Sequence, residues 1–342
     1  MNETTLALDA HGGDQGLDVS VPAALEALRR DDSLRLILVG KEPDVCAALD
    51  RAAPPSALNG RFEIVHADSI VPMDASPAHV LRRGRDSSLW KSFELVAEDR
   101  ARAVISGSGT AALMIAGVKI LGLLPGISRP ALMAWLPNGE SYTGLLDLGA
   151  NLNVDASHLV QFAVMGDVTA RAAENIENPR IGLLNVGHEE SKGHDTVQLA
   201  HERLRSLPLN YTGFIEGHDL FGGAVDVAVC DGFSGNLVLK SSEGLARMLM
   251  AQVRGAFKES LLSRSGLLLA GPALKRALAR LDPSAHNGAP LLGLNRVAVK
   301  SHGGSDVKGM TRAILEAGRE ARRQVPERIE ALVHEYQLES AT

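Results

Sequence analysis

Two polar turns carry the side chains best suited to anion or acid–base chemistry. Lys192 lies in the turn NVGHEESKGHD (residues 185–195), where its charge can attract an anionic substrate, although the same letters also fit a solvated charged loop. Asp231 follows the apolar run VDVAVC (residues 225–230), so it fits either a site carboxylate or a helix cap. Both residues come just after a predicted buried strand, which is where ligands bind in open α/β sheets.

Two glycine-rich turns could bring backbone N–H groups against a ligand. The turn DAHGGD (residues 9–14) contains adjacent glycines, which allow positive φ and a close approach of the backbone. The turn SGSGT (residues 106–110) precedes an apolar helical pattern, and a helix N-terminus of this kind suits an anion. A tight turn without ligand contact is the alternative for the first, and a simple helix cap for the second. The candidate substrate-binding residues here are Asp9, Gly12, Gly13, Asp14, Gly107, Ser108 and Thr110.

Amide and imidazole side chains follow other predicted strands. The strings DLGANLN (residues 147–153), NVG (185–187) and DGFSGN (231–236) each place an asparagine close to a strand end. HGGSD (302–306) adds a histidine, although a lone histidine is more often structural than catalytic. These strings add Asn151, Asn185, Asn236 and His302 to the candidate substrate-binding set.

The sequence contains no clear metal-ligand spacing, so we expect no metal and no cofactor. His188 and His194 lack the HExxH context of a zinc site. The serine motif GxSxG occurs only in broken form at residues 232–235, which argues against acyl-serine chemistry. Cys46 and Cys230 form neither a CxxC pair nor a disulfide framework, which is typical of a reducing cytosol.

Composition limits the class of protein further. The chain has 342 residues, of which 45% are hydrophobic and 22% charged, as in a globular protein. Its net charge of −6 provides no basic excess, so we expect no nucleic-acid partner. The N-terminus has no signal-peptide pattern, and no uninterrupted apolar stretch is long enough to span a membrane. We therefore expect a cytoplasmic protein.

Short apolar runs that end in Gly, Asp or Asn alternate with helical patterns along the chain. This alternation predicts βαβ units and a doubly wound, mostly parallel sheet, whose carboxyl ends should gather the polar turns at one edge. The runs read as strands are 4–12, 34–40, 61–68, 103–109, 131–135, 142–151, 181–187, 211–217, 225–232 and 297–304. The main predicted helices are 20–30 with Ser20 as N-cap, 110–122, 236–262 and 305–324.

One segment departs from the α/β pattern. Residues 258–282 combine five basic side chains and a cluster of leucines with a Gly-rich tip near residues 266–272. We expect a protruding helical hairpin with an apolar tip there. Such a tip could dock on an anionic bilayer or a carrier protein, or it could pack in a dimer interface or the core.

Nine strings, taken in order, are similar to the acyl-acyl-carrier-protein:phosphate acyltransferase family of bacterial phospholipid synthesis. They are DAHGGD, RRGRDSS (82–88), SGSGTAALM, DLGAN, HEESKG, GFIEGHDL, DVAVCDGFSGNLVLK, GAPLLG and HG at 302. The resemblance spans nearly the whole chain. It departs from the family pattern at His11, at residues 109–111 and at Asn153, and the changes near 109 bear on how that loop holds a ligand.

The resemblance implies a fold, a reaction and partners. The fold would be a three-layer α/β/α sandwich similar to the phosphotransacetylase and isocitrate dehydrogenase class, in one domain of two lobes over residues 1–342. The reaction would be direct attack of inorganic phosphate on an acyl carrier protein thioester, with Lys192 and Asp231 as the catalytic pair. The implied partners are acyl carrier protein, a second copy of the chain, the membrane surface and the membrane glycerol-3-phosphate acyltransferase. We expect Lys192 and Asp231 to face one polar pocket beside the turns at 9–14 and 106–110.

Three alternatives stay open at this point. A nicotinamide-dependent decarboxylating dehydrogenase of similar fold would need several metal-binding aspartates, and the position four residues after Asp231 is Gly235. A phosphotransacetylase acting on coenzyme A thioesters would share the pantetheine arm of the donor. A catalytically silent scaffold would bind phosphate or a carrier protein without turning it over.

Overall fold

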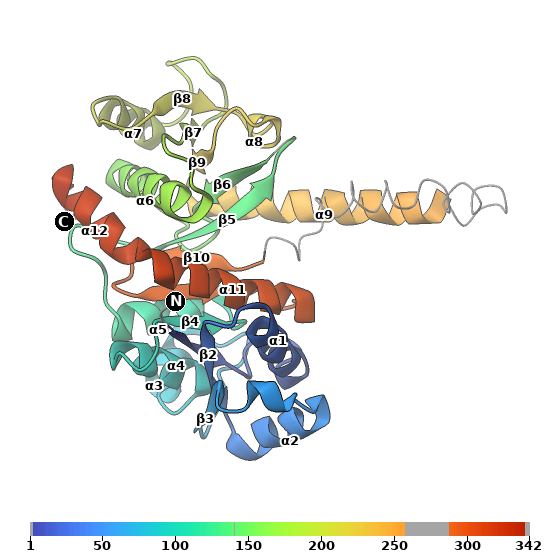
Figure 1. Cartoon of the computed structure of the whole chain (residues 1–342). Coiled ribbons are helices and arrows are strands. Elements are labelled where there is room, and N and C mark those ends of the chain that lie inside the picture. Colours follow the sequence, from blue (N-terminus) through green and yellow to red (C-terminus); the bar gives the residue numbers. More distant parts are fainter. Residues whose placement is uncertain (1–2, 140, 257–286, 339–342) are drawn as a thin grey trace.

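The computed structural model describes residues 3–139, 141–256 and 287–338. The predicted hairpin at 258–282 lies outside the described residues. An eleven-stranded sheet runs through the described part in the order β3-β2-β1-β4-β11-β10-β5-β6-β9-β7-β8 (Figure 1). The strands are β1 Thr4–Asp9, β2 Leu34–Gly40, β3 Phe62–His66, β4 Ala103–Ser106, β5 Ala131–Pro137, β6 Tyr142–Leu146, β7 Ile181–Leu184, β8 Tyr211–Ile215, β9 Val227–Val229, β10 Ala289–Leu292 and β11 Val297–Lys300.

Helices cover both faces of this sheet, which confirms the predicted three-layer α/β/α class. In β1, Leu6 and Leu8 pack with helices α1 and α11, whereas Ala7 between them faces α4 and α5. Alternate side chains of a strand point to opposite faces, so a strand buried on both faces is apolar throughout. The helices are α1 Leu17–Arg30, α2 Glu42–Ala52, α3 Pro77–Arg83, α4 Ser88–Ala97, α5 Thr110–Ile120, α6 Ala156–Glu174, α7 Asp195–Arg205, α8 Asp219–Gly222, α9 Gly232–Ala256, α11 Val307–Arg323 and α12 Val325–Glu335.

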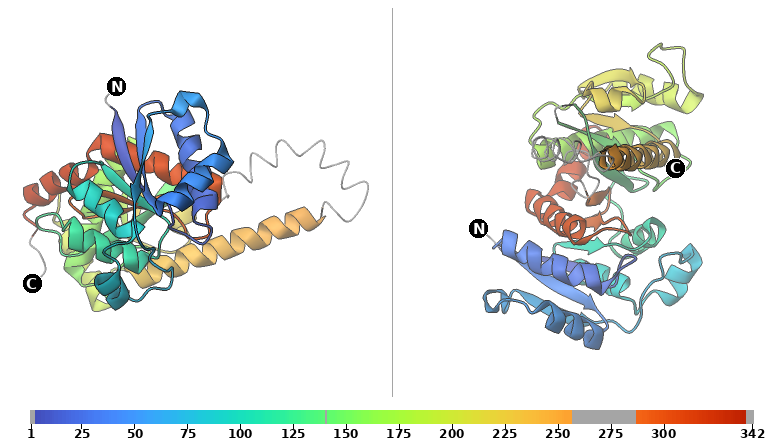
Figure 2. Two further views of the ribbon diagram at one scale, coloured as in Figure 1. Left: turned by 90° about the horizontal axis from the view of Figure 1, so that it is seen from below. Right: turned by 90° about the vertical axis from the view of Figure 1, so that its right-hand side faces the viewer.

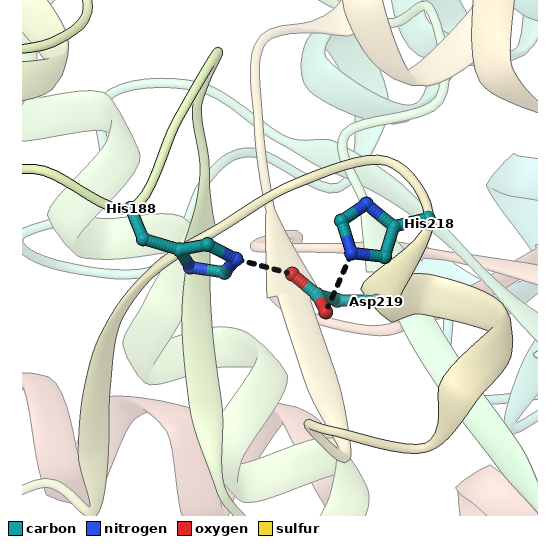
Figure 3. A group of neighbouring side chains, drawn as sticks. All are labelled: His188, His218 and Asp219. Carbon is teal, nitrogen blue, oxygen red and sulfur yellow. Dashed lines mark ion pairs between the residues drawn. The ribbon is translucent and has the colours of Figure 1, made fainter.

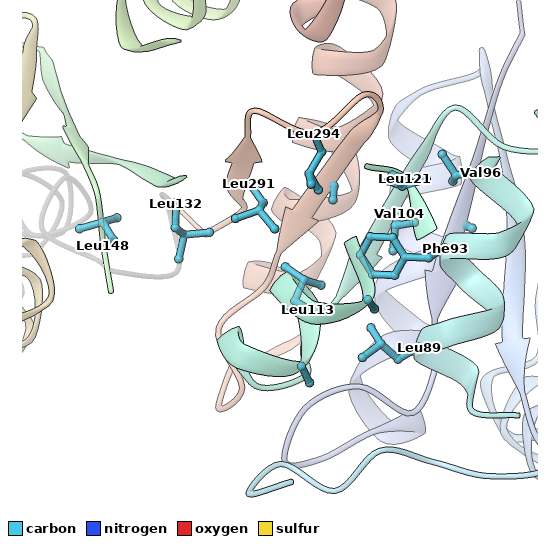
Figure 4. Close-up of a cluster of buried hydrophobic side chains, with 14 of the residues drawn as sticks. Leu89, Phe93, Val96, Val104, Leu113, Leu121, Leu132, Leu148, Leu291 and Leu294 are labelled. Atoms are coloured by element: carbon cyan, nitrogen blue, oxygen red, sulfur yellow. The ribbon is translucent and has the colours of Figure 1, made fainter. Parts of the chain in front are cut away.

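One core cluster is continuous across the middle of the sheet. It runs from Phe93 of α4 and Leu113 of α5 past Leu291 of β10 to Leu132 and Leu148 (Figure 4). The three strands β11, β10 and β5 therefore join the two ends of the sheet through a shared apolar layer, and not only through backbone hydrogen bonds.

The sheet reverses direction across its middle. The pairs β11–β10, β10–β5 and β5–β6 are antiparallel, whereas β3, β2, β1, β4 and β11 are mutually parallel, as are β6, β9, β7 and β8. Three reversals leave these two strand groups pointing in opposite directions. The expectation that all polar turns gather at one edge of the sheet is therefore wrong, because carboxyl ends of the two groups lie at opposite edges.

Three local expectations also change. Helix α1 begins at Leu17 after Gly16, so Ser20 is not its N-cap; it is buried inside the helix, where its hydroxyl donates to Ala10 O at 2.5 Å. Helix α9 begins at Gly232, before the predicted start at 236. Strand β10 was not among the predicted strands, because its four residues include Pro290 and give too short a pattern.

Helix α9 extends away from the sheet as a long rod (Figures 1 and 2). Its exposed apolar side chains include Leu237, Leu245, Met248 and Leu249. No helix in the described ranges is both long and apolar enough to cross a bilayer.

Candidate functional site

The turns after β1 and β4 are held together by one buried carboxylate. Asp9 is 1% exposed and accepts hydrogen bonds from the hydroxyls of Ser88 at 2.6 Å, Ser106 at 2.6 Å and Ser108 at 3.0 Å. Both of its oxygens are therefore used inside the protein. Asp9 organises the base of the site through these three hydroxyls, a role that the turn sequence alone did not identify.

The glycines of these turns allow backbone to pack against backbone. A Cβ on Gly12 would lie 2.9 Å from Gly107 N, and a Cβ on Gly107 would lie 2.8 Å from Gly12 O. Gly13 has a φ of +100°, and Asp14 N donates to Gly303 O at 2.9 Å. The turns after β1, β4 and β11 therefore form one packed unit, in which the two close glycines make room for each other.

A large cavity opens beside this unit, and we call it the lysine cavity. Its volume is about 590 Å³, within the range of small-molecule sites. Thr110, Lys300 and His302 line it from the first strand group, and Asn236 and Lys240 line it from α9. The remainder of the wall is largely apolar and includes Leu132, Ala134, Trp135, Leu136, Leu148, Phe221, Leu239, Leu245 and Leu249.

Two lysines and a histidine meet at the polar end of the lysine cavity. Lys300 Nζ donates to Ser108 O at 2.8 Å and to Ser301 O at 3.3 Å. Lys240 Nζ lies 3.2 Å from His302 Nε2 and 3.1 Å from the Glu243 carboxylate. Burial, with a further contribution from Lys240, lowers the pKa of Lys300 to about 8. Burial, followed by the nearby Lys240, also lowers the pKa of His302.

Asn287 fixes the turn that carries His302. Its side-chain amide donates to the hydroxyls of Ser301 at 2.7 Å and Ser305 at 2.8 Å, and its oxygen accepts from His302 N at 2.8 Å. The residues from 301 to 305 are thereby held rigidly at the carboxyl end of β11, next to the first turn of α5.

A second cavity, which we call the Asp231 cavity, lies at the carboxyl ends of β7 and β9. Its volume is about 560 Å³, and its lining includes Asn185, His194, Asp231 and Ser234. Asp231 accepts from Ser234 N at 2.9 Å and from Ser234 Oγ at 2.7 Å, so it caps helix α9. The carboxylate therefore fulfils the helix-cap alternative and also lines a cavity.

Lys192 lines neither cavity. It lies exposed in the loop after β7, where its carbonyl accepts from the Asn185 side chain at 3.1 Å. Asn185 also donates to Gly187 O at 3.2 Å, so this amide braces the loop. The structure therefore places Asp231 and Thr110 against different cavities, and Lys192 against neither, in place of the expected single pocket.

Asp147 and Asn151 hold the turn after β6. Asp147 is fully buried and accepts from Leu132 N at 2.9 Å, and from Asn151 N at 2.6 Å. Burial raises the pKa of Asp147, while these backbone donors act in the opposite direction. Asn151 is 4% exposed and donates to Pro130 O at 2.8 Å, so its amide is used within the protein.

His188, His218 and Asp219 form the group that could hold a divalent cation in the described ranges (Figure 3). Nε2 of His188 lies 3.3 Å from Asp219, and Nε2 of His218 lies 3.5 Å from it. The His188 Nδ1 atom lies 3.1 Å from Phe214 O. Asp219 Oδ2 also accepts from Glu216 N at 2.8 Å, so part of its acceptor capacity is used within the protein. The group has no signal in the sequence, because His188 and the pair His218–Asp219 belong to separate turns.

The structure divides the predicted site residues into four sets. Thr110, Asn236 and His302 line the lysine cavity, and Asn185 and Asp231 line the Asp231 cavity. Lys192 and Asp14 are exposed and line neither cavity. The other predicted residues form the turns after β1, β4 and β6, namely Asp9, Gly12, Gly13, Gly107, Ser108 and Asn151. Sequence reasoning missed Lys240 and Lys300, of which Lys300 had one usable signal: a lysine that ends the apolar run VAVK just before HGG.

Comparisons with known proteins agree over almost the full length. A family model described as "Fatty acid synthesis protein" matches residues 4–328. A phosphate acyltransferase of Alkalilimnicola ehrlichii is 47% identical over 326 residues, covering 95% of both chains. One from Legionella pneumophila strain Paris is 43% identical over 337 residues, covering 98% of both.

Solved structures extend the likeness to the fold. A phosphotransacetylase from Streptococcus pyogenes superposes with a TM-score of 0.62 at 19% identity, covering 94% of each chain. A phosphotransacetylase from Staphylococcus aureus gives a TM-score of 0.60 at 16% identity, again covering 94% of each chain. At these identities the likeness concerns the fold alone.

Proposed function

The chain belongs to the fatty acid synthesis protein family, and from this premise we propose that it transfers a fatty acyl group from acyl carrier protein to inorganic phosphate. The products are an acyl phosphate, which serves phospholipid synthesis, and the free carrier. The relatives named phosphate acyltransferase, at 43–47% identity over nearly the full chain, carry this proposal.

The chemistry needs no acyl-enzyme. A phosphate oxygen forms a bond to the thioester carbonyl carbon while the C–S bond breaks, and the leaving thiolate of the carrier arm takes up a proton. The protein must align phosphate with the carbonyl, shield the charge of the anion and stabilise the developing oxyanion. No oxidant, reductant or resident cofactor enters this balance.

The lysine cavity has a composition that suits the two substrates. Most of its lining is apolar, as an acyl chain requires, because each buried methylene contributes about 0.8 kcal/mol. Its polar end carries Lys240, Lys300 and His302, as an anion requires. This places an apolar and a cationic environment within one cavity.

We propose the catalytic pair from the family resemblance. Lys192 would attract the phosphate or the developing oxyanion, and Asp231 would orient phosphate or accept its proton. The positions of both residues, after adjacent parallel strands β7 and β9, support a shared role. The proposed substrate-binding residues remain Asp9, Gly12, Gly13, Asp14, Gly107, Ser108, Thr110, Asn151, Asn185, Asn236 and His302, of which the buried ones act by holding the turns.

The proposal extends to the assembly. We propose that the chain acts as one α/β domain of two lobes, since a single sheet joins both strand groups and the lysine cavity draws on each. We also propose a cytoplasmic homodimer that associates peripherally with the membrane, near the glycerol-3-phosphate acyltransferase that uses acyl phosphate. Leu237 and Met248 are exposed on α9 and do not line the lysine cavity, which supports a role of this helix in association.

A donor comparison tests the function. The protein is mixed with phosphate and a long-chain acyl thioester of either carrier protein or coenzyme A, and acyl phosphate is quantified as its hydroxamate. The proposal expects higher kcat/KM with the carrier protein donor. Preference for coenzyme A would identify a phosphotransacetylase, and absence of acyl phosphate with both donors would contradict the proposal.

A further inference from the structure

We propose that inorganic phosphate binds at the polar end of the lysine cavity, between Lys300, Lys240, His302 and the first turn of helix α5. The inference rests on the proposed acyl transfer and deepens it by naming the residues that hold the attacking anion. It adds Lys300, which the family resemblance did not name, to the residues proposed to act on phosphate.

The first argument is an excess of positive charge. The lining of the lysine cavity contains three cationic side chains, Lys240, Arg247 and Lys300, against one carboxylate, Glu243. Glu243 is already shared by Lys240 at 3.1 Å and Arg247 at 3.7 Å. Among the described residues, Lys300 has no carboxylate partner within ion-pair distance, so cationic side chains outnumber carboxylates in the lining and favour an anion there.

The second argument is an excess of hydrogen-bond donors. Gly304 N donates to His302 Nδ1 at 3.1 Å, so the ring proton of neutral His302 is on Nε2. That Nε2–H faces the Lys240 ammonium at 3.2 Å, which places two donors against each other without an acceptor between them. An oxyanion that accepts from both groups resolves this arrangement.

Helix α5 contributes further donors. Its N-cap is Gly109, which has no side chain to accept from the first N–H groups. Thr110, the first residue of the helix, lines the lysine cavity, and Ser108 O anchors Lys300 on the same turn. The first residue of α5 and Lys300 therefore line the same cavity, and the helix dipole adds to the attraction for an anion.

The burial of Lys300 also favours anion binding at this position. The burial that lowers the pKa of Lys300 makes its charged form costly until an anion binds. Among nearby groups, Asp14 favours the charged form of Lys300. Glu243 favours the charged form of His302. Phosphate binding should restore the pKa of Lys300 toward its ordinary value. The carbonyls of Ser108 and Ser301 keep the ammonium in place meanwhile.

The phosphodiester of the carrier's pantetheine arm offers the same chemistry as inorganic phosphate, so the experiment has to separate them. Direct binding of inorganic phosphate to the full chain is measured by calorimetry without acyl donor. The KM values for phosphate and for acyl carrier protein are measured in parallel. The variants are Lys300→Gln and Lys240→Gln, and Lys119→Gln on the exposed end of α5 is the matched control.

Loss of one charge-assisted contact predicts a clear shift. Lys300→Gln should raise the Kd and KM for phosphate about 10-fold to 100-fold. Lys240→Gln should raise the Kd and the KM for phosphate by a smaller factor, and Lys119→Gln should change neither constant. Because Lys240 is exposed on α9, its variant keeps the test available even if Lys300→Gln fails to fold.

Two outcomes overturn the inference. One is unchanged phosphate binding in folded Lys300→Gln or, if that variant does not fold, in Lys240→Gln. The other is a rise confined to the KM for acyl carrier protein, which would assign the site to the pantetheine phosphodiester. If wild-type protein binds phosphate through Lys300 but forms no acyl phosphate, the site stands and the proposed function fails.

Discussion

Lys240 and His302 are 62 positions apart in the chain, yet Nζ of one lies 3.2 Å from Nε2 of the other. The contact joins helix α9, which follows the second strand group, to the turn after β11 in the first. The polar turns of the two groups leave the sheet at opposite edges, and α9 carries Lys240 from the end of β9 to the turn after β11. The lysine cavity depends on this crossing.

The exposed loop lysine offers a clean test of the catalytic pair. Lys192→Ala should lower kcat/KM for acyl phosphate formation by about 100-fold or more, the scale of removing one electrostatic stabiliser of a transition state. The fold should be unaffected, since the side chain is exposed. Steady-state kinetics beside a circular dichroism melt measure both, with Lys119→Ala as control. Near-normal turnover would remove Lys192 from the mechanism.

The lowered pKa of Lys300 predicts a pH dependence. The ammonium is present below about pH 8 and is lost above it, so the KM for phosphate should rise as pH increases through about 8. Lys300→Arg keeps its charge throughout this range and should give a flatter profile. Measuring the KM for phosphate from pH 6.5 to 9.5 tests this, and identical profiles for the two proteins would contradict it.

Asp9 is expected to act on stability. Asp9→Ala leaves three buried hydroxyls, on Ser88, Ser106 and Ser108, without their acceptor. Each lost partner costs about 1–3 kcal/mol, so the free energy of unfolding should fall by roughly 3 kcal/mol or more. Urea denaturation measures this, with the exposed Asp74→Ala as the matched control. A change below about 1 kcal/mol would contradict the role given to this network.

A buried acid in α11 predicts a stability change with pH. Glu320 is 1% exposed, and burial followed by the nearby Glu316 raises its pKa to about 8. The folded state therefore holds a proton that the unfolded state has released, and stability falls as pH rises from about 4.5 to 8.

Glu320→Gln removes this penalty. The variant should melt higher than wild type by roughly 5 °C at pH 8 and by much less at pH 5. Scanning calorimetry at both values measures it, with exposed Glu327→Gln as control. A melting difference that is the same at both pH values would show that Glu320 does not titrate as described.

The sequence predicted the parts that depend on local patterns. Apolar runs such as LRLILVG became β2, and the Gly-terminated runs became strands because both faces of the sheet are covered. Asp231 was correctly placed after a strand, since strand ends carry a local signal.

The features that the sequence did not predict depend on pairing between strands that are distant in the chain. Parallel βαβ reasoning could not foresee the three antiparallel pairs around β10 and β5, which reverse the direction of the sheet. Lys300 and Lys240 lie in separate strings of ordinary composition, so their meeting is visible only in three dimensions. The sequence suggests that Asp9 and Asn151 contact a ligand, but in the structure both side chains form hydrogen bonds within the protein.

The most direct test of the proposed function is the stoichiometry of the reaction. Wild-type protein is given a long-chain acyl carrier protein thioester with and without phosphate, and released thiol and acyl phosphate are both quantified. Phosphate-dependent release of one thiol for each acyl phosphate formed is the predicted result. Thiol release that does not depend on phosphate and yields free fatty acid would instead identify a thioesterase and contradict the account.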